Sequence, residues 1–160
     1  MVAAVVLAAG AGTRYGGPKQ HELLPAVLAA LRETSIEQIV VVQGAYELDA
    51  PGAQIVDCPR WAEGPGASLR CGLAAIGADV THALVVLADG PSLDARAVDR
   101  LVAHREDAPV VAASYDGNRS HPVVIARSAW DDVPDEGARA LTPTLVDCSD
   151  LEPPGDVDVR

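Results

Sequence analysis

The sequence contains no phenylalanine, and aromatic residues make up only 3% of its 160 residues. Its 49% hydrophobic content therefore consists mostly of Ala, Val and Leu. Small and β-branched aliphatic side chains suit a buried parallel sheet covered by Ala-rich helices. A chain of this length buries roughly 70% of its unfolded surface, so we expect a single domain over residues 1–160.

Basic residues are also scarce. The chain has 12 Lys and Arg against 23 Asp and Glu, which gives a net charge of −11. A nucleic-acid partner or an anionic membrane surface requires a clustered basic face, so the composition argues against both. A small phosphorylated ligand stays compatible with this charge, because a few cations and backbone N–H groups can hold it locally.

The three cysteines, Cys58, Cys71 and Cys148, are an odd number, are widely spaced and form no C-x-x-C pair. This spacing favours neither a disulfide framework nor a zinc site, and we expect buried thiols in a cytoplasmic protein. The apolar run at residues 2–9 follows no basic segment and is too short to span a bilayer. We interpret this run as a first strand and expect no membrane segment.

Short apolar runs alternate with helical patterns along the chain. Buried strands are predicted at residues 2–7, 39–42, 84–87 and 110–113. Helical spacing is found at residues 23–31, 69–76 and 97–102, the last after Asp94, a candidate N-cap. A later strand at 122–126, antiparallel and at an edge, precedes a short helix with Trp130 and Val133.

This alternation predicts an α/β fold, a single doubly wound, mostly parallel sheet with helices on both faces, as in Rossmann-like proteins. In open sheets of this type, ligands bind beyond the carboxyl ends of the strands. Functional residues are therefore expected in the loops that follow strands.

A glycine-rich loop follows the first predicted strand. Residues 7–19 read Leu-Ala-Ala-Gly-Ala-Gly-Thr-Arg-Tyr-Gly-Gly-Pro-Lys, and Lys19 is the only lysine of the chain. Glycines let backbone N–H groups approach phosphate oxygens, and Arg14 and Lys19 can neutralise those oxygens. The loop is neither a Walker A motif nor G-x-G-x-x-G, because the final glycine has no Lys-Ser or Lys-Thr after it and position 15 is Tyr. The alternative is a simple turn with two solvated cations.

These residues resemble the signature of the MobA-like nucleotidyltransferase family, and of its MocA (CTP:molybdopterin cytidylyltransferase) branch in particular. Five further segments follow in the order of the family, at residues 61–73, 87–93, 120–123, 137–141 and 156–158. One departure lies directly after Lys19, where the longer segment with a Gly-x-Pro-Leu turn that is usual in the family is missing. Six segments in the correct order are far more specific than any one of them.

The resemblance implies an Mg²⁺-dependent nucleotidyltransferase of molybdenum cofactor biosynthesis. It implies three groups of site residues. The catalytic group is Arg14, Lys19 and Asp89, the nucleotide-binding group is Leu7, Ala8, Ala9, Gly10, Gly12 and Ser68, and the acceptor-binding group is His121 and Arg139. Asp89 and Asp158 are the implied metal ligands, with Asp156 as the alternative to Asp158.

Several of these residues also have a structural alternative. Asp89 directly follows the predicted strand at 84–87, where a carboxylate can hold Mg²⁺, but an Asp before Gly-Pro is also a common turn residue. Ser68 is either a nucleotide contact or a helix cap. His121 is either an acceptor ligand or a structural hydrogen-bond donor, and Arg139 is either a phosphate clamp or an ordinary helix residue.

By resemblance, an acceptor phosphate attacks the α-phosphorus of a nucleoside triphosphate and pyrophosphate leaves. The attacking group is already anionic, so no protein general base is required. The Ala8-Ala9-Gly10 form of the loop resembles the branch that uses CTP rather than GTP, with molybdopterin or another small phosphorylated acceptor. The alternatives are guanylyl transfer, transfer to a sugar or alcohol phosphate, and a shortened module that binds nucleotide without turnover.

Overall fold

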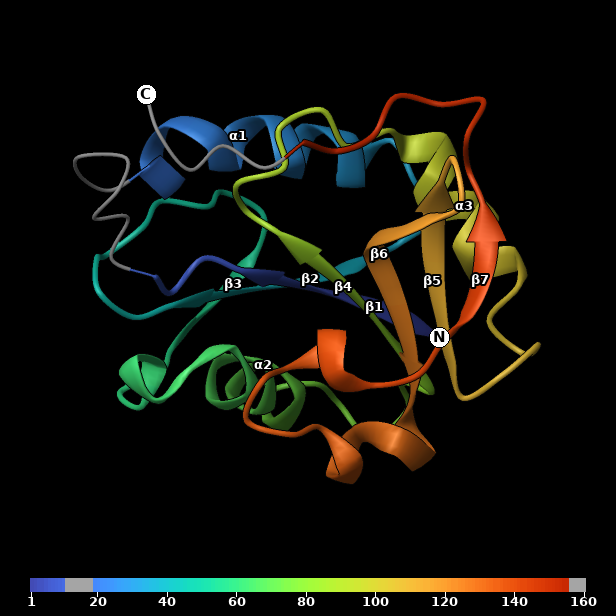
Figure 1. Ribbon diagram of the computed structural model, residues 1–160. Coiled ribbons are helices and arrows are strands. Elements are labelled where there is room, and N and C mark those ends of the chain that lie inside the picture. The colour runs from blue at the N-terminus through green and yellow to red at the C-terminus, as the bar shows by residue number, and fades with distance from the viewer. Residues whose placement is uncertain (11–18, 156–160) are drawn as a thin grey trace.

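The computed structural model describes residues 1–10 and 19–155, without the side chains of residues 19–21. Seven strands form one sheet in the order β3-β2-β1-β4-β6-β5-β7 (Figure 1). Their bounds are β1 Val2–Leu7, β2 Gln38–Gln43, β3 Gln54–Asp57, β4 His82–Leu87, β5 Val110–Tyr115, β6 Asn118–Ala126 and β7 Thr144–Asp147. Only β6 is antiparallel to its neighbours. The predicted doubly wound, mostly parallel α/β fold is confirmed.

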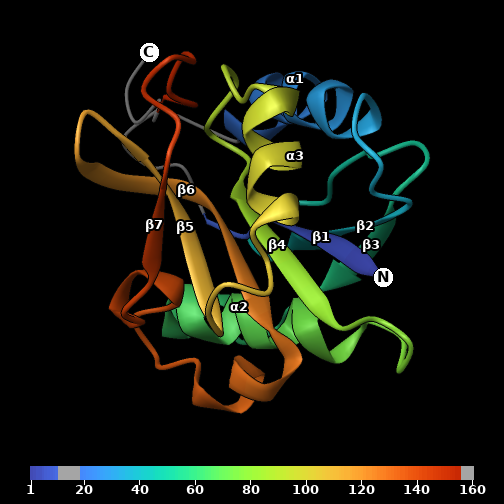
Figure 2. The same ribbon diagram turned by 90° about the vertical axis from the view of Figure 1, so that its right-hand side faces the viewer.

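Helices cover both faces of the sheet. Helices α1 (Lys19–Arg32) and α3 (Ala95–Ala103) lie on one face and α2 (Pro65–Ala74) on the other (Figures 1 and 2). Three 3-10 turns complete the described elements, η1 (Trp61–Glu63), η2 (Arg127–Asp132) and η3 (Ala138–Ala140). Within the described ranges, no helix has the length and apolar character needed to cross a membrane.

Two local predictions for the helices are confirmed. The apolar stripe of α1, Leu24, Val27, Leu28 and Leu31, is buried in the core between the sheet and this helix layer. Asp94 caps α3, because its carboxylate accepts a hydrogen bond of 2.8 Å from the backbone amide of Arg96. The helical spacing of apolar residues and the capping residue Asp94 were therefore sufficient to predict both helices.

Strand β6 is antiparallel as predicted, but its predicted place at an edge is wrong. It lies between β4 and β5, and Val124 and Ile125 are completely buried. Pro122, which cannot donate to a ladder, lies where the β5–β6 pairing shifts register between Ala112 and Ser114. The sheet can therefore tolerate a proline in a central strand at this irregularity. The true edges are β3 and β7, of 4 residues each and mostly exposed, which are too short to give a periodic signal.

The expectation of three buried thiols is wrong for two of the cysteines. Cys58 and Cys71 form a disulfide with a Cα–Cα distance of 5.9 Å, whereas Cys148 is free and buried. Cys58 directly follows β3, and Cys71 lies on α2, which packs against β1 and β2. The packing of α2 on the sheet brings the two sulfurs together. The separation of 13 residues in sequence does not by itself predict this disulfide.

We predict that reduction of this disulfide lowers the free energy of unfolding by about 3 kcal/mol, because the closed loop restricts the unfolded chain. Urea denaturation with and without dithiothreitol measures the difference. A Cys58→Ala, Cys71→Ala double variant is the control and should not respond to the reductant. Equal denaturation midpoints for the oxidised and the reduced protein would contradict the prediction.

Helix α2 approaches the sheet most closely at Gly72. A Cβ atom at this position would lie 2.6 Å from Val5 Cγ1 and 2.9 Å from Val42 Cγ2. Both valines belong to central strands that cannot move away without disturbing the core. The glycine is therefore required by packing, although it is a poor helix former.

We predict that Gly72→Ala destabilises the protein by about 1–3 kcal/mol through overpacking. Intrinsic helix propensity alone predicts a stabilisation of about 1 kcal/mol, so the sign of the change separates the two effects. The reverse substitution at the exposed Ala74 of the same helix is the control, and should follow propensity. Chemical denaturation of both variants measures these changes, and a Gly72→Ala variant at least as stable as the wild type refutes the packing account.

Candidate active site

The loops that follow β1 and β4 start side by side at one edge of the sheet. The two strands are parallel, with Leu7 opposite Leu87. Backbone pairing continues past both strand ends, because Ala88 donates to the Leu7 carbonyl at 3.1 Å and Ala8 donates to the Val42 carbonyl at 3.0 Å. The glycine-rich loop and Asp89 therefore leave the sheet from the same place, where ligands bind in folds of this type.

His121 lies close to Asp89 because β6 runs antiparallel, which brings its first half to the same edge. A Cβ atom on Gly90 would lie 2.8 Å from His121 Cε1, so the imidazole packs directly on the backbone after Asp89. Burial lowers the pKa of His121, although the Asp89 carboxylate and the backbone of Gly155 oppose this change. The ring is therefore neutral at neutral pH. Both of its nitrogens are buried from solvent.

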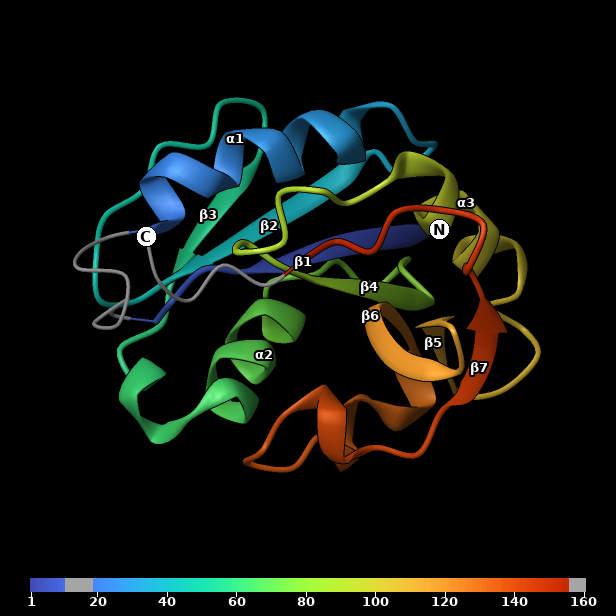
Figure 3. The same cartoon turned by 45° about the horizontal axis from the view of Figure 1, so that its top comes forward.

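The residues at this edge fit part of a magnesium site. Asp89 is half-buried beyond a strand end, and Mg²⁺ typically takes one or two protein carboxylates together with substrate phosphates. The described residues contain no cluster of three or more potential metal ligands, and Asp156 and Asp158 lie outside them. Figure 3 shows the chain after β7 returning to the loop after β4, where Pro154 accepts a hydrogen bond of 2.9 Å from Ser92.

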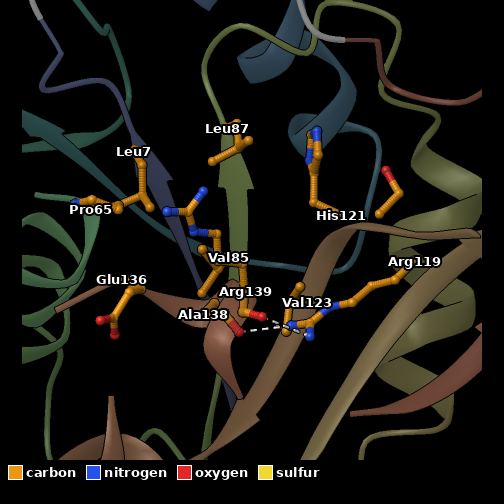
Figure 4. A pocket seen from close by; sticks show the side chains of 11 residues that line it. Leu7, Pro65, Val85, Leu87, Arg119, His121, Val123, Glu136, Ala138 and Arg139 are labelled. Atoms are coloured by element: carbon orange, nitrogen blue, oxygen red, sulfur yellow. Dashed lines mark hydrogen bonds between the residues drawn. The ribbon is translucent and has the colours of Figure 1, made fainter. Parts of the chain in front are cut away.

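A cavity of about 530 Å³ lies next to these groups (Figure 4). This volume falls within the range of roughly 300–1,000 Å³ that is typical of small-molecule sites. Its walls are largely apolar, formed by Leu7, Pro65, Val85, Leu87, Val123 and Ala138. The polar residues at its border are Arg119, Ser120, His121, Glu136 and Arg139. The cavity therefore combines an apolar body with a few charged groups.

The two arginines of the cavity behave differently. The Arg139 side chain extends from η3 into the cavity toward Leu7 and Val85, while the Glu136 carboxylate points away (Figure 4). Within the described part of the chain, the Arg139 guanidinium has no ion pair, so it is available to an anionic ligand. Arg119 instead hydrogen-bonds the backbone of the segment that carries Arg139.

The structure brings several predicted site residues together. Leu7, His121 and Arg139 line the cavity, and Asp89 lies beside His121. Arg139 belongs to a 3-10 turn rather than to the start of an α-helix. The predicted roles of these residues in binding and catalysis stay predictions.

Other predicted residues lie elsewhere or outside the description. Gly12, Arg14 and Asp158 are outside the described residues, and Lys19 begins α1 with its side chain not described. Ala8 and Ala9 are buried at the start of the glycine-rich loop, and Gly10 is its last residue described before the gap. Because the Ala8 amide is bonded to Val42, Ala8 can offer a nucleotide only its carbonyl or methyl group.

Ser68 does not cap a helix, so that alternative is wrong. Helix α2 begins at Pro65 and its N-cap is Gly64, which places Ser68 inside the first turns. Ser68 is buried and is not among the residues that line the cavity. Its contact with a nucleotide stays a prediction.

Sequence reasoning missed Arg119, which borders the cavity. Its partners are carbonyl groups 19 to 22 residues further along the chain, so no local pattern reveals the contact. Its position close to the His121-Pro122 pair was the available signal. The cavity walls from Pro65 and Ala138 were missed for the same reason, since they meet only in the folded chain.

The model of the MobA-like NTP transferase domain family matches residues 4–142. The chain belongs to this family. It is therefore a nucleotidyltransferase, and the matched range contains the glycine-rich loop, Asp89, His121 and Arg139. A search of curated proteins finds no match.

Solved structures give the same fold. A homologue of Mycobacterium tuberculosis Rv0371c from Mycobacterium sp. strain JC1 is 25% identical, with a TM-score of 0.83 over 99% of this chain and 90% of that one. Rv0371c of M. tuberculosis H37Rv is also 25% identical, with a TM-score of 0.82 over 99% and 93% of the two chains. Another structure of Rv0371c, in complex with manganese, is 20% identical, with a TM-score of 0.70 over 91% and 87%.

The buried imidazole of His121 predicts a loss of stability in acid. Because burial lowers its folded-state pKa below the unfolded value near 6.5, the unfolded chain binds more protons. Its contribution is therefore fully present above pH of about 6.5 and is lost as the pH falls toward the folded pKa. His121→Asn should flatten this dependence between about pH 7.5 and 5.

Thermal or urea denaturation across this pH range measures the effect. The buried His82, whose pKa is also lowered by burial, is present in both proteins and cancels in the comparison. If the stability of the wild type and of His121→Asn depends on pH in the same way, His121 has the same pKa in the folded and the unfolded chain, which contradicts the prediction.

Proposed function

We propose that this nucleotidyltransferase transfers CMP from CTP to a small phosphorylated acceptor such as molybdopterin, with release of pyrophosphate and with Mg²⁺ as the metal. One observation carries the proposal. A largely apolar cavity of about 530 Å³, with the Arg139 guanidinium in it, lies beside Asp89 at the edge from which the glycine-rich loop departs. A transferase needs a place for a second substrate next to the nucleotide, and this cavity meets that need.

In the proposed reaction, an oxygen of the acceptor phosphate forms a bond with the α-phosphorus of CTP. The bond from the α-phosphorus to the bridging oxygen of the β-phosphate breaks, and pyrophosphate leaves with the electron pair. The attacking oxygen is anionic, so the residues around it must position and neutralise charge rather than remove a proton. Mg²⁺, when bound, supplies positive charge to the phosphate oxygens.

Individual residues then have distinct tasks in this proposal. Asp89 holds the metal, with Asp158 as the proposed second carboxylate. Arg14, Lys19 and the backbone at Gly10 and Gly12 hold the triphosphate, and Ser68 contacts the nucleoside. The solved structure of Rv0371c in complex with manganese supports a divalent cation in a protein of this fold.

The character of the cavity favours one acceptor class over another. Arg139 suits a phosphate, and walls built from Leu7, Val85, Leu87 and Val123 suit a flat ring system. A sugar phosphate would place several hydroxyl groups against these apolar walls, away from the hydrogen-bond partners at the polar border. Molybdopterin is therefore preferred to a sugar phosphate. The choice of CTP over GTP depends on the Ala8-Ala9-Gly10 form of the loop.

Pyrophosphate release tests this proposal. We predict that the purified protein with Mg²⁺ and molybdopterin releases pyrophosphate from CTP, with a lower kcat/KM for GTP. Asp89→Asn should lower the rate by about 100-fold or more, because the metal would lose a protein ligand. Asp99→Asn, on the exposed surface of α3, is the matched control and should leave the rate unchanged.

The alternative of a binding module without turnover predicts a different result. Nucleotide binding alone, at about 100 times Kd, stabilises a protein by roughly 2.7 kcal/mol. A thermal shift with CTP and no pyrophosphate with molybdopterin would therefore refute the transfer to this acceptor. No pyrophosphate with sugar or alcohol phosphates either would identify a binder. Faster turnover with GTP than with CTP would contradict only the proposed preference for CTP.

A further inference from the structure

The segment of residues 133–141 forms one wall of the cavity and carries Arg139. Apart from the packing of Val133, Ala138 and Leu141 against the core, arginine side chains bond it to the rest of the molecule at two places. At its start, Arg70 of α2 donates to the Val133 carbonyl at 2.9 Å and pairs with the Asp135 carboxylate at 3.0 Å. The Gly66 amide adds a bond of 2.9 Å to the Asp135 carbonyl. This first attachment ends before Arg139.

The second attachment is made by Arg119 of β6. Its Nη1 donates to the carbonyls of Arg139 at 3.0 Å and Leu141 at 2.6 Å, and its Nη2 donates to the carbonyl of Ala138 at 2.7 Å. Figure 4 shows two of these bonds as dashed lines beside the cavity. One planar guanidinium thus holds three carbonyl groups of a single turn, including that of Arg139 itself.

Among the described residues, no carboxylate balances the positive charge of Arg119. Burial lowers the pKa of its guanidinium, and no carboxylate of the described residues forms an ion pair with it. An arginine nevertheless stays protonated. The three hydrogen bonds of Arg119 are therefore charge-assisted, and they hold the turn more strongly than a neutral donor would.

We propose that Arg119 is a positioning residue for the acceptor. It fixes the backbone of η3 so that the Arg139 guanidinium projects into the cavity. This inference rests on the proposed function, in which Arg139 binds the phosphate of the acceptor. It assigns to Arg119 an effect on acceptor binding that is separate from nucleotide binding.

Backbone hydrogen exchange tests the brace without any substrate. In Arg119→Met, the amides of Ala140 and Leu141, which bond to the carbonyls of Gly137 and Ala138, should exchange at least about tenfold faster. In the matched control Arg70→Met, faster exchange should be confined to residues 133–137. Unchanged exchange at 138–141 in Arg119→Met would overturn the proposal, whatever the acceptor is.

Steady-state kinetics then tests the consequence for the acceptor. With molybdopterin as the varied substrate, Arg119→Met should raise KM by about tenfold or more while the Kd for CTP stays within about twofold. Arg70→Met should leave the KM for molybdopterin within about twofold of the wild type. Arg119→Lys keeps the charge but cannot span three carbonyls, so it should resemble Arg119→Met rather than the wild type.

A double-mutant cycle decides whether Arg119 acts through Arg139. Once Arg139→Met has removed the guanidinium, adding Arg119→Met should raise KM by less than about twofold further. Full additivity of the two effects, or a wild-type KM in Arg119→Met, would overturn the positioning role. A wild type that releases no pyrophosphate with molybdopterin contradicts the proposed acceptor instead, and the exchange comparison then decides the role of Arg119.

Discussion

The parallel pairing of β1 with both β2 and β4 is the constraint on which the whole site depends. It forces the chain to leave three adjacent strands at one edge of the sheet, and the bonds from Ala8 to Val42 and from Ala88 to Leu7 hold these exits together. The glycine-rich loop and Asp89 are neighbours only because of this pairing. A shift of register would place them at different depths and separate the glycine-rich loop from the proposed metal ligand.

The second constraint is the insertion of β6 in the opposite direction between β4 and β5. An antiparallel strand brings its first residues, rather than its last, to the functional edge. Arg119 and His121 therefore line the same cavity as Leu87, and this cavity lies between β4, β6 and the segment of residues 133–141. The parallel half of the sheet serves the nucleotide in this account, and the half that contains β6 serves the acceptor.

Features with a local origin could be predicted from the sequence. The α1 stripe, the Asp94 cap and the buried strands follow from spacing and capping chemistry, and six ordered segments sufficed to find the family. Features created by contacts distant in sequence could not be predicted. The Cys58–Cys71 disulfide depends on how α2 packs, β6 is central because of its pairing with β4, and the bonds of Arg119 reach a turn 19 to 22 residues away.

The central claim is that nucleotide, metal and acceptor meet at this one edge of the sheet. A crystal structure with a non-hydrolysable CTP analogue and Mn²⁺, with the metal located by its anomalous signal, tests it most directly. We expect a metal peak beside Asp89, the triphosphate along the glycine-rich loop that follows β1, and an unfilled cavity in front of Arg139. A nucleotide seated within that cavity, or a metal distant from Asp89, would contradict the claim.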